Sequence, residues 1–133
     1  MNIKTINFTT IQDERGALSF FEIGQNKQVP FAVKRVYYLF NLNEKERGFH
    51  AHKELQQLII CVSGSCSMVL DDGKERKIVE LSKPNQGLLI DKMIWREICN
   101  IAPNTVIVVL ASEYYDESDY IRNYDEFLNT VSI

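Results

Sequence analysis

The segment RGFHAHKELQQLIICVSG, residues 47–64, carries the pattern that decides the fold of this 133-residue chain. It places His50 and His52 one residue apart, continues through an apolar run over residues 55–62 and ends in a Ser63-Gly64 turn. Residues i and i+2 of a β-strand point to the same face, so the two imidazoles would lie side by side. They are the only two histidines in the sequence. The pair indicates a metal site, a proton-transfer site or a polar surface.

Short apolar segments of the same kind surround this one. They are rich in Val, Ile, Leu, Phe and Tyr and are separated by turn residues, among which Asp72-Gly73 is a strong hairpin signal. Many short strands at this spacing are typical of a β-sandwich or barrel. We therefore predict an all-β body within residues 3–112, with strands over 17–23, 33–40, 55–62, 67–71, 77–81, 87–90 and 105–111.

The end of the chain has a different periodicity. Its apolar residues fall on one helical face, at i, i+1, i+4, i+7 and i+8, and Asp116 or Ser118 can cap the start of a helix. We predict one C-terminal helix over residues 116–129 that packs on the sheet. Because no linker or repeat divides the sequence, residues 1–133 are expected to form a single domain.

Composition excludes several classes of protein. The formal net charge is −3, which argues against a strongly basic binder of nucleic acid or of anionic membranes. No apolar run is long enough to span a bilayer, and no secretory signal is recognisable. The three cysteines, Cys61, Cys66 and Cys99, include no Cys-x-x-Cys pair. We expect a cytoplasmic protein with reduced thiols.

The spacing after the histidines resembles the first motif of the cupins, in which His-x-His is followed by Glu and then by Gly. Here Gln57 stands in the position of the Glu. The second cupin motif usually supplies another histidine, but the corresponding stretch reads Trp95-Arg96-Glu97. Two neutral imidazoles and one amide are a poor ligand set for Zn²⁺, Fe²⁺ or Mn²⁺. We therefore expect a jelly-roll scaffold with no metal and no other cofactor.

Without a metal, two imidazoles on one face can serve as acid–base groups at neutral pH. They could remove a proton from one carbon of a substrate and deliver one to its neighbour, as in keto–enol isomerisation beside a carbonyl. A pair of satisfied, partly buried histidines with no chemical role is the alternative. The cupin spacing favours the active pair, because it would place them in a barrel mouth, where ligands usually bind.

Longer strings resemble one named family. The chain is similar to the sugar 3,4-ketoisomerases that act on dTDP-4-keto-6-deoxyglucose, the WxcM-like or FdtA/QdtA group of RmlC-like cupins, and the likeness runs from Asp13-Glu14-Arg15-Gly16 almost to the end. The strings that carry it are RGFHAHK (47–53), LQQL (55–58), VSGSC (62–66), LDDG (70–73), VLAS (109–112) and YDESDYIRNYD (115–125).

The resemblance implies a cupin jelly roll, or double-stranded β-helix, that forms a homodimer by exchanging N-terminal strands. It implies metal-free interconversion of a 4-keto and a 3-keto nucleotide sugar through an enediol, for the deoxyaminosugars of lipopolysaccharide O-antigen or S-layer glycans. The catalytic residues of the family fall on His50, His52 and Tyr37. A similar Asp-x-Arg-Gly string in the dTDP-sugar 3,5-epimerases makes Arg15 a candidate phosphate ligand.

Further candidates for substrate binding follow from position. Arg35 and Tyr37 alternate along one strand, so both can face a polar ligand. A diphosphate bound to an acidic protein needs local cations, and arginine suits phosphate well. Trp95 could stack on thymine or fill the core, and Arg96 replaces a histidine that is frequent in the family. The full set of predicted substrate-binding residues is Arg15, Arg35, Arg47, Lys53, Gln57, Trp95 and Arg96.

Three other functions stay open from the sequence. A 3,5-epimerase would act on the same class of substrate, although that family typically has a single histidine after Arg-Gly. A non-catalytic cupin would bind a sugar without exchanging its protons. A metal-dependent cupin oxygenase would need bound iron. The product configuration at C4 and the identity of the first base also stay open.

Overall fold

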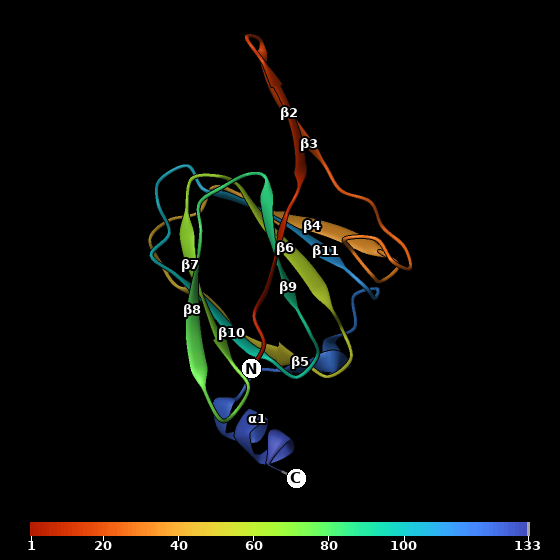
Figure 1. Ribbon diagram of the computed structural model, residues 1–133. Helices are drawn as coiled ribbons and strands as arrows, with labels where there is room; N and C mark the ends of the chain where they lie inside the picture. The colour runs from red at the N-terminus through yellow and green to blue at the C-terminus, as the bar shows by residue number, and fades with distance from the viewer. Residues whose placement is uncertain (133) are drawn as a thin grey trace.

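Two antiparallel β-sheets face each other in the computed structural model, which describes residues 1–132. The chain runs through twelve strands, one short 3₁₀ helix and one α-helix within those residues (Figure 1). All seven predicted strands are present, with ends that differ by up to three residues, and the all-β jelly roll with a single C-terminal helix is confirmed. Strands also form outside the ranges predicted from periodicity, at β1 (Lys4–Asn7), β2 (Thr9–Asp13), β5 (Arg47–His52), β10 (Trp95–Cys99) and β12 (Tyr120–Ile121).

The first sheet has the strand order β1-β9-β6-β11-β4. Its register places Val109 opposite both Tyr37 and Ile59, and Ala111 opposite both Arg35 and Gln57. The alternation of each strand turns these rows toward the second sheet. Its strands are β1 (Lys4–Asn7), β4 (Arg35–Leu39), β6 (Gln57–Ser63), β9 (Gln86–Ile90) and β11 (Val106–Ala111).

The second sheet has the order β12-β5-β10-β7-β8. Arg96 is the cross-strand neighbour of His50 on one side and of Leu70 on the other. The predicted Asp72-Gly73 turn joins β7 to β8, and Gly73 adopts a φ of 94° there. The strands are β5 (Arg47–His52), β7 (Cys66–Asp71), β8 (Arg76–Leu81), β10 (Trp95–Cys99) and β12 (Tyr120–Ile121).

The core fills one part of the space between the two sheets. Ile59, Ile107 and Val109 of the first sheet pack in one cluster with Met68 and Leu70 of the second. Burial of such side chains is the main force that holds the two sheets together. The apolar cluster leaves the ends of β4, β5, β6 and β10 free to carry polar side chains inward.

The C-terminal segment differs from the prediction in where its helix begins. The 3₁₀ helix Glu117–Asp119 follows Asp116, β12 then pairs with β5, and α1 spans Tyr124–Val131. Asn123, and not Asp116 or Ser118, caps α1 by accepting a hydrogen bond from the backbone of Glu126. Pairing along the free edge of β5 outweighs helix formation at residues 120–121, because it satisfies backbone groups of both segments.

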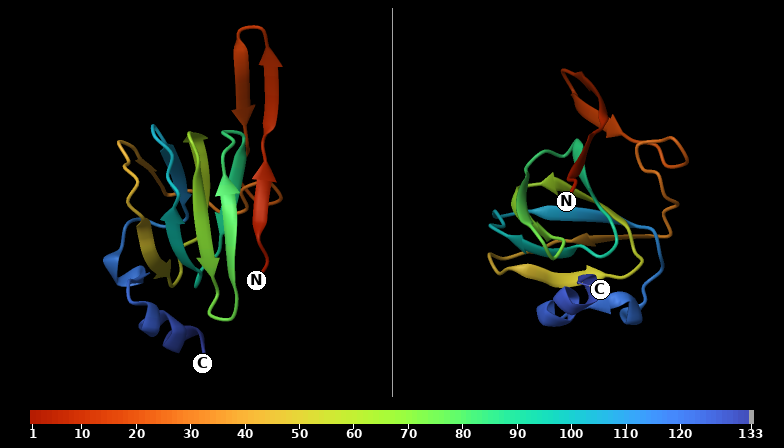
Figure 2. Two further views of the ribbon diagram at one scale, coloured as in Figure 1. Left: turned by 90° about the vertical axis from the view of Figure 1, so that its left-hand side faces the viewer. Right: turned by 60° about the horizontal axis from the view of Figure 1, so that its bottom comes forward.

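Strands β2 (Thr9–Asp13) and β3 (Gly16–Phe20) form a separate two-stranded hairpin. It projects away from the barrel, as both views in Figure 2 show. Ile11 pairs with Leu18 and Thr9 with Phe20, so these side chains share one face. The side chains of Ile11, Leu18 and Phe20 are 62%, 58% and 42% exposed. The hairpin therefore presents an uncovered apolar face.

Candidate active site

A cavity of about 270 Å³ opens between the two sheets and is lined partly by apolar core residues, such as Ile59, Ile107 and Val109, and partly by polar residues. Tyr37 and Gln57 reach it from the first sheet, and His50 and Arg96 reach it from the second. Among residues 1–132, four arginines line the cavity and no Asp or Glu does. The cavity therefore suits an anionic ligand. Its arginines are Arg35, Arg47, Arg96 and Arg122.

His50 lies on the wall of this cavity. Its Nδ1 is 3.1 Å from the carbonyl oxygen of Gly48, which can only accept a hydrogen bond. The proton of the neutral ring is therefore on Nδ1, and Nε2 carries the lone pair. Burial, followed by the charge of Arg96, lowers the pKa of His50 from its ordinary 6.5 to about 4. His50 is thus neutral at pH 7 and is able to accept a proton.

His52 is fully buried next to His50, with 4.9 Å between the ring centroids. Its Nδ1 donates to Oδ2 of Asp119 at 3.1 Å, which fixes the same tautomer. Within residues 1–132, its buried Nε2 has no hydrogen-bond partner. Burial and then the charge of Arg96 lower the pKa of His52 to about 2. His52 opens on a second hollow of about 580 Å³, which shares Arg35, Tyr115 and Tyr120 with the first.

A chain of three polar side chains crosses the cavity between the sheets. Arg96 is 2% exposed and donates to Oε1 of Gln57 and to the carbonyl of Ile94. Gln57 is 1% exposed and donates through Nε2 to the hydroxyl of Tyr37 at 2.7 Å. Burial raises the pKa of Tyr37, so its hydroxyl keeps its proton at neutral pH. Gln57 is thus held from both sides.

Aromatic rings hold the outer arginines of the cavity. The Arg35 guanidinium lies 5.2 Å from the ring centroid of Tyr37 and 5.6 Å from that of Tyr115, and its Nε is buried without a hydrogen-bond partner in the described part of the chain. Arg122 lies 4.1 Å from the ring of Tyr120 and forms an ion pair with Glu117. Arg122 also lines the cavity.

The structure brings six of the predicted residues to this cavity: Arg35, Tyr37, Arg47, His50, Gln57 and Arg96. His52 adjoins it through His50.

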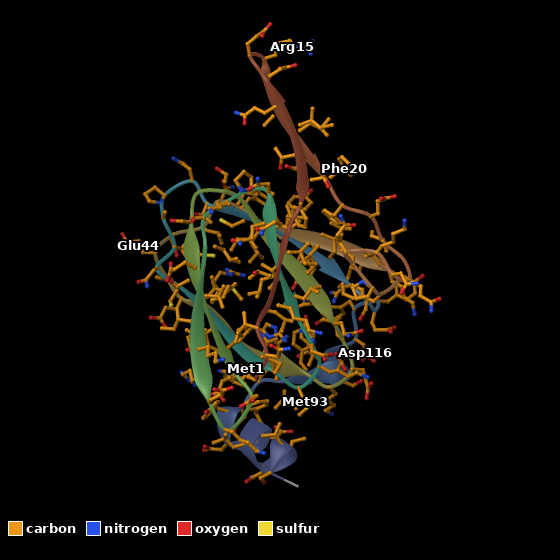
Figure 3. All side chains as sticks on the ribbon, in the orientation of Figure 1. Met1, Arg15, Phe20, Glu44, Met93 and Asp116 are labelled. Atoms are coloured by element: carbon orange, nitrogen blue, oxygen red, sulfur yellow. The ribbon has the colours of Figure 1, made fainter. Side chains whose placement is uncertain are left out.

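Three predicted substrate-binding residues are not brought to the cavity within one chain. Trp95 precedes Arg96 in β10 and so points to the opposite face, where it packs against Tyr124 and Phe127. Lys53 follows His52 and its side chain is exposed to solvent. Arg15 lies at the tip of the hairpin, paired with Asp13 and 85% exposed, and Figure 3 shows it far from Asp116 and the 3₁₀ helix.

Sequence reasoning missed Tyr115, Asp119 and Tyr120. The predicted helix over residues 116–129 includes Asp119 and Tyr120 and gives them no role in the site. These residues could have been found if residues 120–121 had been read as a strand that continues the sheet. Their pairing with Ala51 and His52 brings the preceding segment against the histidines.

No group of three or more His, Cys, Asp or Glu residues that could hold a metal ion occurs within residues 1–132. The described residues also contain no helix of the length and hydropathy required to cross a bilayer.

Comparisons with known proteins agree on one family. The family model "FdtA: WxcM-like, C-terminal" matches residues 1–132. The TDP-4-oxo-6-deoxy-alpha-D-glucose-3,4-oxoisomerase of Aneurinibacillus thermoaerophilus is 48% identical over 133 residues, which cover 99% of this chain and 94% of that protein.

Two solved structures are also similar. The 3,4-ketoisomerase of Helicobacter canadensis has 44% identity and a TM-score of 0.94, over 100% of this chain and 99% of that one. A histidine-to-asparagine variant of the 3,4-ketoisomerase QdtA from Thermoanaerobacterium thermosaccharolyticum, in complex with TDP-4-keto-6-deoxyglucose, has 42% identity and a TM-score of 0.92, over 98% and 94%. The chain therefore belongs to the FdtA family of WxcM-like sugar ketoisomerases.

Proposed function

We propose that this protein is an isomerase that converts TDP-4-keto-6-deoxyglucose to a TDP-3-keto-6-deoxyhexose. Relatives that are 42–48% identical over nearly the whole chain carry this activity in their names. The observation that carries the proposal is the state of His50. It is a neutral imidazole with its lone pair on Nε2, and it lines the same arginine-rich cavity as the protonated hydroxyl of Tyr37.

The reaction needs a base and a proton donor on adjacent groups. His50 Nε2 takes the proton from C3, and the electron pair of the C3–H bond forms the C3=C4 double bond. The carbonyl oxygen on C4 takes the Tyr37 proton, which gives an enediol. The protonated His50 then delivers its proton to C4, while the hydroxyl on C3 returns a proton to Tyr37 and becomes the new carbonyl. No atom is gained or lost, and the enzyme returns to its starting state.

His52 supports this chemistry from behind His50. Its Nδ1–H is held by Asp119, and its ring packs edge-on against His50. The lone pair on its Nε2 has no hydrogen-bond partner within the described residues. A charged His52 would oppose protonation of His50, and burial keeps it neutral.

The diphosphate of the substrate would lie against Arg35, Arg47 and Arg122. Arg35 and Arg47 form no ion pair within residues 1–132, and arginine binds phosphate oxygens with two N–H groups at once. The aromatic rings that hold Arg35 and Arg122 limit their movement, so less entropy is lost on binding.

The hairpin β2–β3 supports a homodimer with exchanged N-terminal strands. An isolated two-stranded hairpin is marginally stable in water, so the apolar face of Ile11, Leu18 and Phe20 needs a cover. The outer face of the edge strand β4, with Val36 and Tyr38 exposed, is a matching apolar surface on a second copy. In such a dimer, Arg15 would reach the diphosphate in the partner's cavity.

Leu18→Glu would place a charge on the apolar face of the hairpin. It is expected to yield monomers in sedimentation at fixed concentration, whereas Ser19→Glu on the other face is the matched control. A wild-type protein that sediments as a monomer, or a Leu18→Glu dimer, would contradict strand exchange.

The biological setting follows from the product. A 3-keto sugar is the form that an aminotransferase can convert to a 3-amino sugar, as the deoxyaminosugars of O-antigen or S-layer glycans require. The cytoplasm is the proposed compartment, since Cys61, Cys66 and Cys99 are free thiols.

The direct test compares the wild-type enzyme with the double variant His50→Asn/His52→Asn. We expect the wild type to form a 3-keto product, and the double variant to form none while it binds TDP with an affinity close to that of the wild type. Full activity in the double variant would overturn the assignment of the base. A 4-keto product epimerised at C3 or C5 would indicate the 3,5-epimerase, and binding without solvent exchange would indicate a non-catalytic cupin. Activity that depends on bound iron would indicate an oxygenase.

A further inference from the structure

In the cupins that this sequence resembles, the position of Gln57 holds an acidic metal ligand. Here Gln57 is buried between one side chain that needs a hydrogen-bond acceptor and another that faces a donor. Arg96 has only N–H donors, so the group that faces it must be the amide oxygen of Gln57. The amide nitrogen must then face Tyr37, whose hydroxyl lies 2.7 Å away. The position of the arginine therefore decides which way the amide points.

The direction of the amide fixes the role of the tyrosine. A hydroxyl that accepts an N–H from Gln57 keeps its own proton for another partner. Tyr37 lines the cavity, so that proton is available to a ligand oxygen inside it. A tyrosine hydroxyl without this contact could rotate and act as either donor or acceptor.

Burial makes the arrangement rigid. Gln57 and Arg96 are 1% and 2% exposed, and Arg96 is also held by two hydrogen bonds to the carbonyl of Ile94. Among residues 1–132, no carboxylate lies within ion-pair distance of Arg96 that could compete for its Nη1. The hydrogen bonds of Gln57 thereby connect β10 of the second sheet to β4 of the first.

We infer that Gln57 is a positioning residue that, oriented by Arg96, holds the Tyr37 hydroxyl as a proton donor toward the substrate oxygen. The inference rests on the proposed function for its catalytic consequence. Its structural content, the direction of the hydrogen bond between Gln57 and Tyr37, does not depend on that function.

Two replacements of Gln57 separate positioning from packing. Gln57→Glu keeps the volume and forms an ion pair with Arg96, but its second oxygen can only accept. The Tyr37 proton then turns toward Glu and away from the substrate. Gln57→Met removes both hydrogen bonds and leaves the Tyr37 hydroxyl free to rotate. Positioning predicts the larger loss of kcat for Glu, about 10²-fold or more, as for the removal of a general acid. A packing role predicts the larger loss for Met, since Arg96 loses its acceptor.

A double-mutant cycle that combines Gln57→Glu with Tyr37→Phe gives the sharpest kinetic readout. If Gln57 acts through Tyr37, Tyr37→Phe/Gln57→Glu loses no more kcat than Tyr37→Phe alone. KM and TDP affinity stay within a few-fold of wild type in each variant, because the diphosphate contacts are elsewhere. Gln86→Glu is the matched control, since Gln86 also begins a strand but its side chain contacts Asn7 outside the cavity. Multiplicative losses in the cycle, or an active Gln57→Glu enzyme, would overturn the inference.

A titration of Tyr37 tests the same contact without turnover. In the wild type, the nearby charge of Arg96 and the Gln57 hydrogen bond both lower the pKa of Tyr37 against the effect of burial. Gln57→Glu should raise it, as followed by ¹³C NMR of Cζ-labelled tyrosine with Tyr37→Phe for assignment. An unchanged pKa would overturn the inference. If the wild type forms no 3-keto product, the proposed function fails, and this titration still decides whether Gln57 orients Tyr37.

Discussion

The two buried histidines predict a specific loss of stability between pH 6.5 and pH 5. In the folded protein, burial and the Arg96 charge hold the pKa of His50 at about 4 and that of His52 at about 2. In the unfolded chain both return to about 6.5. The unfolded state therefore binds protons that the folded state excludes. Their contribution to stability is fully present above pH 6.5 and is lost as the pH falls toward 4.

The size of the loss follows from the two pKa values of each group. At pH 5, an imidazole with a pKa of about 6.5 is about 97% protonated in the unfolded chain. Each histidine that the folded protein keeps unprotonated then lowers the free energy of unfolding by about 2 kcal/mol. The two histidines together remove about 4 kcal/mol between pH 7.5 and pH 5. The chain has no other histidine. Carboxylates with lowered pKa, such as Asp71 and Glu117, titrate mainly below this window.

Urea unfolding at pH 7.5, 6.5, 5.8 and 5.0, at one protein concentration, measures this loss directly. His50→Asn should retain about half of the pH dependence, and the double variant His50→Asn/His52→Asn should retain little of it. A stability that stays constant over the window would refute the reasoning. So would an equal loss in the double variant, because the histidines would then not be the groups that are kept neutral.

The other predictions concern catalysis and one tight turn. First, kcat/KM should stay level from pH 8 to pH 5 and fall as the pH approaches about 4, since His50 must be neutral to act as a base; a fall centred near the ordinary histidine pKa would contradict the proposed burial of the base. Second, Asp119→Asn should lower kcat by about tenfold or more with little change in TDP affinity, because the amide no longer fixes the His52 tautomer; steady-state kinetics and calorimetric binding would show this, and unchanged kcat would remove Asp119 from the account. Third, Gly64→Ala should destabilise the fold by about 1–3 kcal/mol, because φ is 76° and the new Cβ would lie 2.8 Å from the Cα of Thr105; thermal unfolding measures it, with Gly24→Ala as a control that also has a positive φ but whose nearest contact is 3.6 Å.

Most of the barrel could be predicted because its strands are short apolar segments separated by strong turn signals. Examples are the Asp72-Gly73 hairpin and the strands predicted over residues 55–62 and 105–111, which the structure places at 57–63 and 106–111. The helix start could not be placed, because residues 120 and 121 fit a helical face and a strand edge equally well by periodicity. Only the free edge of β5, formed by residues far away in the sequence, decides between them.

Part of the candidate site could likewise be predicted from the sequence, and part could not. The His-x-His spacing and the alternation of Arg35 and Tyr37 could be read from the sequence, because strand geometry alone puts them on one face. The contact of Gln57 with Arg96 could not, since it joins two sheets across the barrel. From the sequence, Trp95 could either fill the core or stack on the thymine of the substrate. Because Arg96 points into the cavity, its neighbour Trp95 points to the opposite face and packs against α1.

The position of the carbonyl in the product tests the central claim most directly. TDP-4-keto-6-deoxyglucose is incubated with the enzyme in D₂O, and the product is examined by ¹³C and ¹H NMR. The account predicts a carbonyl at C3, and at C4 either the hydrogen that His50 took from C3 or a deuterium that exchanged onto the protonated His50 from solvent. The His50→Asn/His52→Asn variant should form no C3 carbonyl. A carbonyl that stays at C4, with deuterium at C5 or with none incorporated, would contradict it.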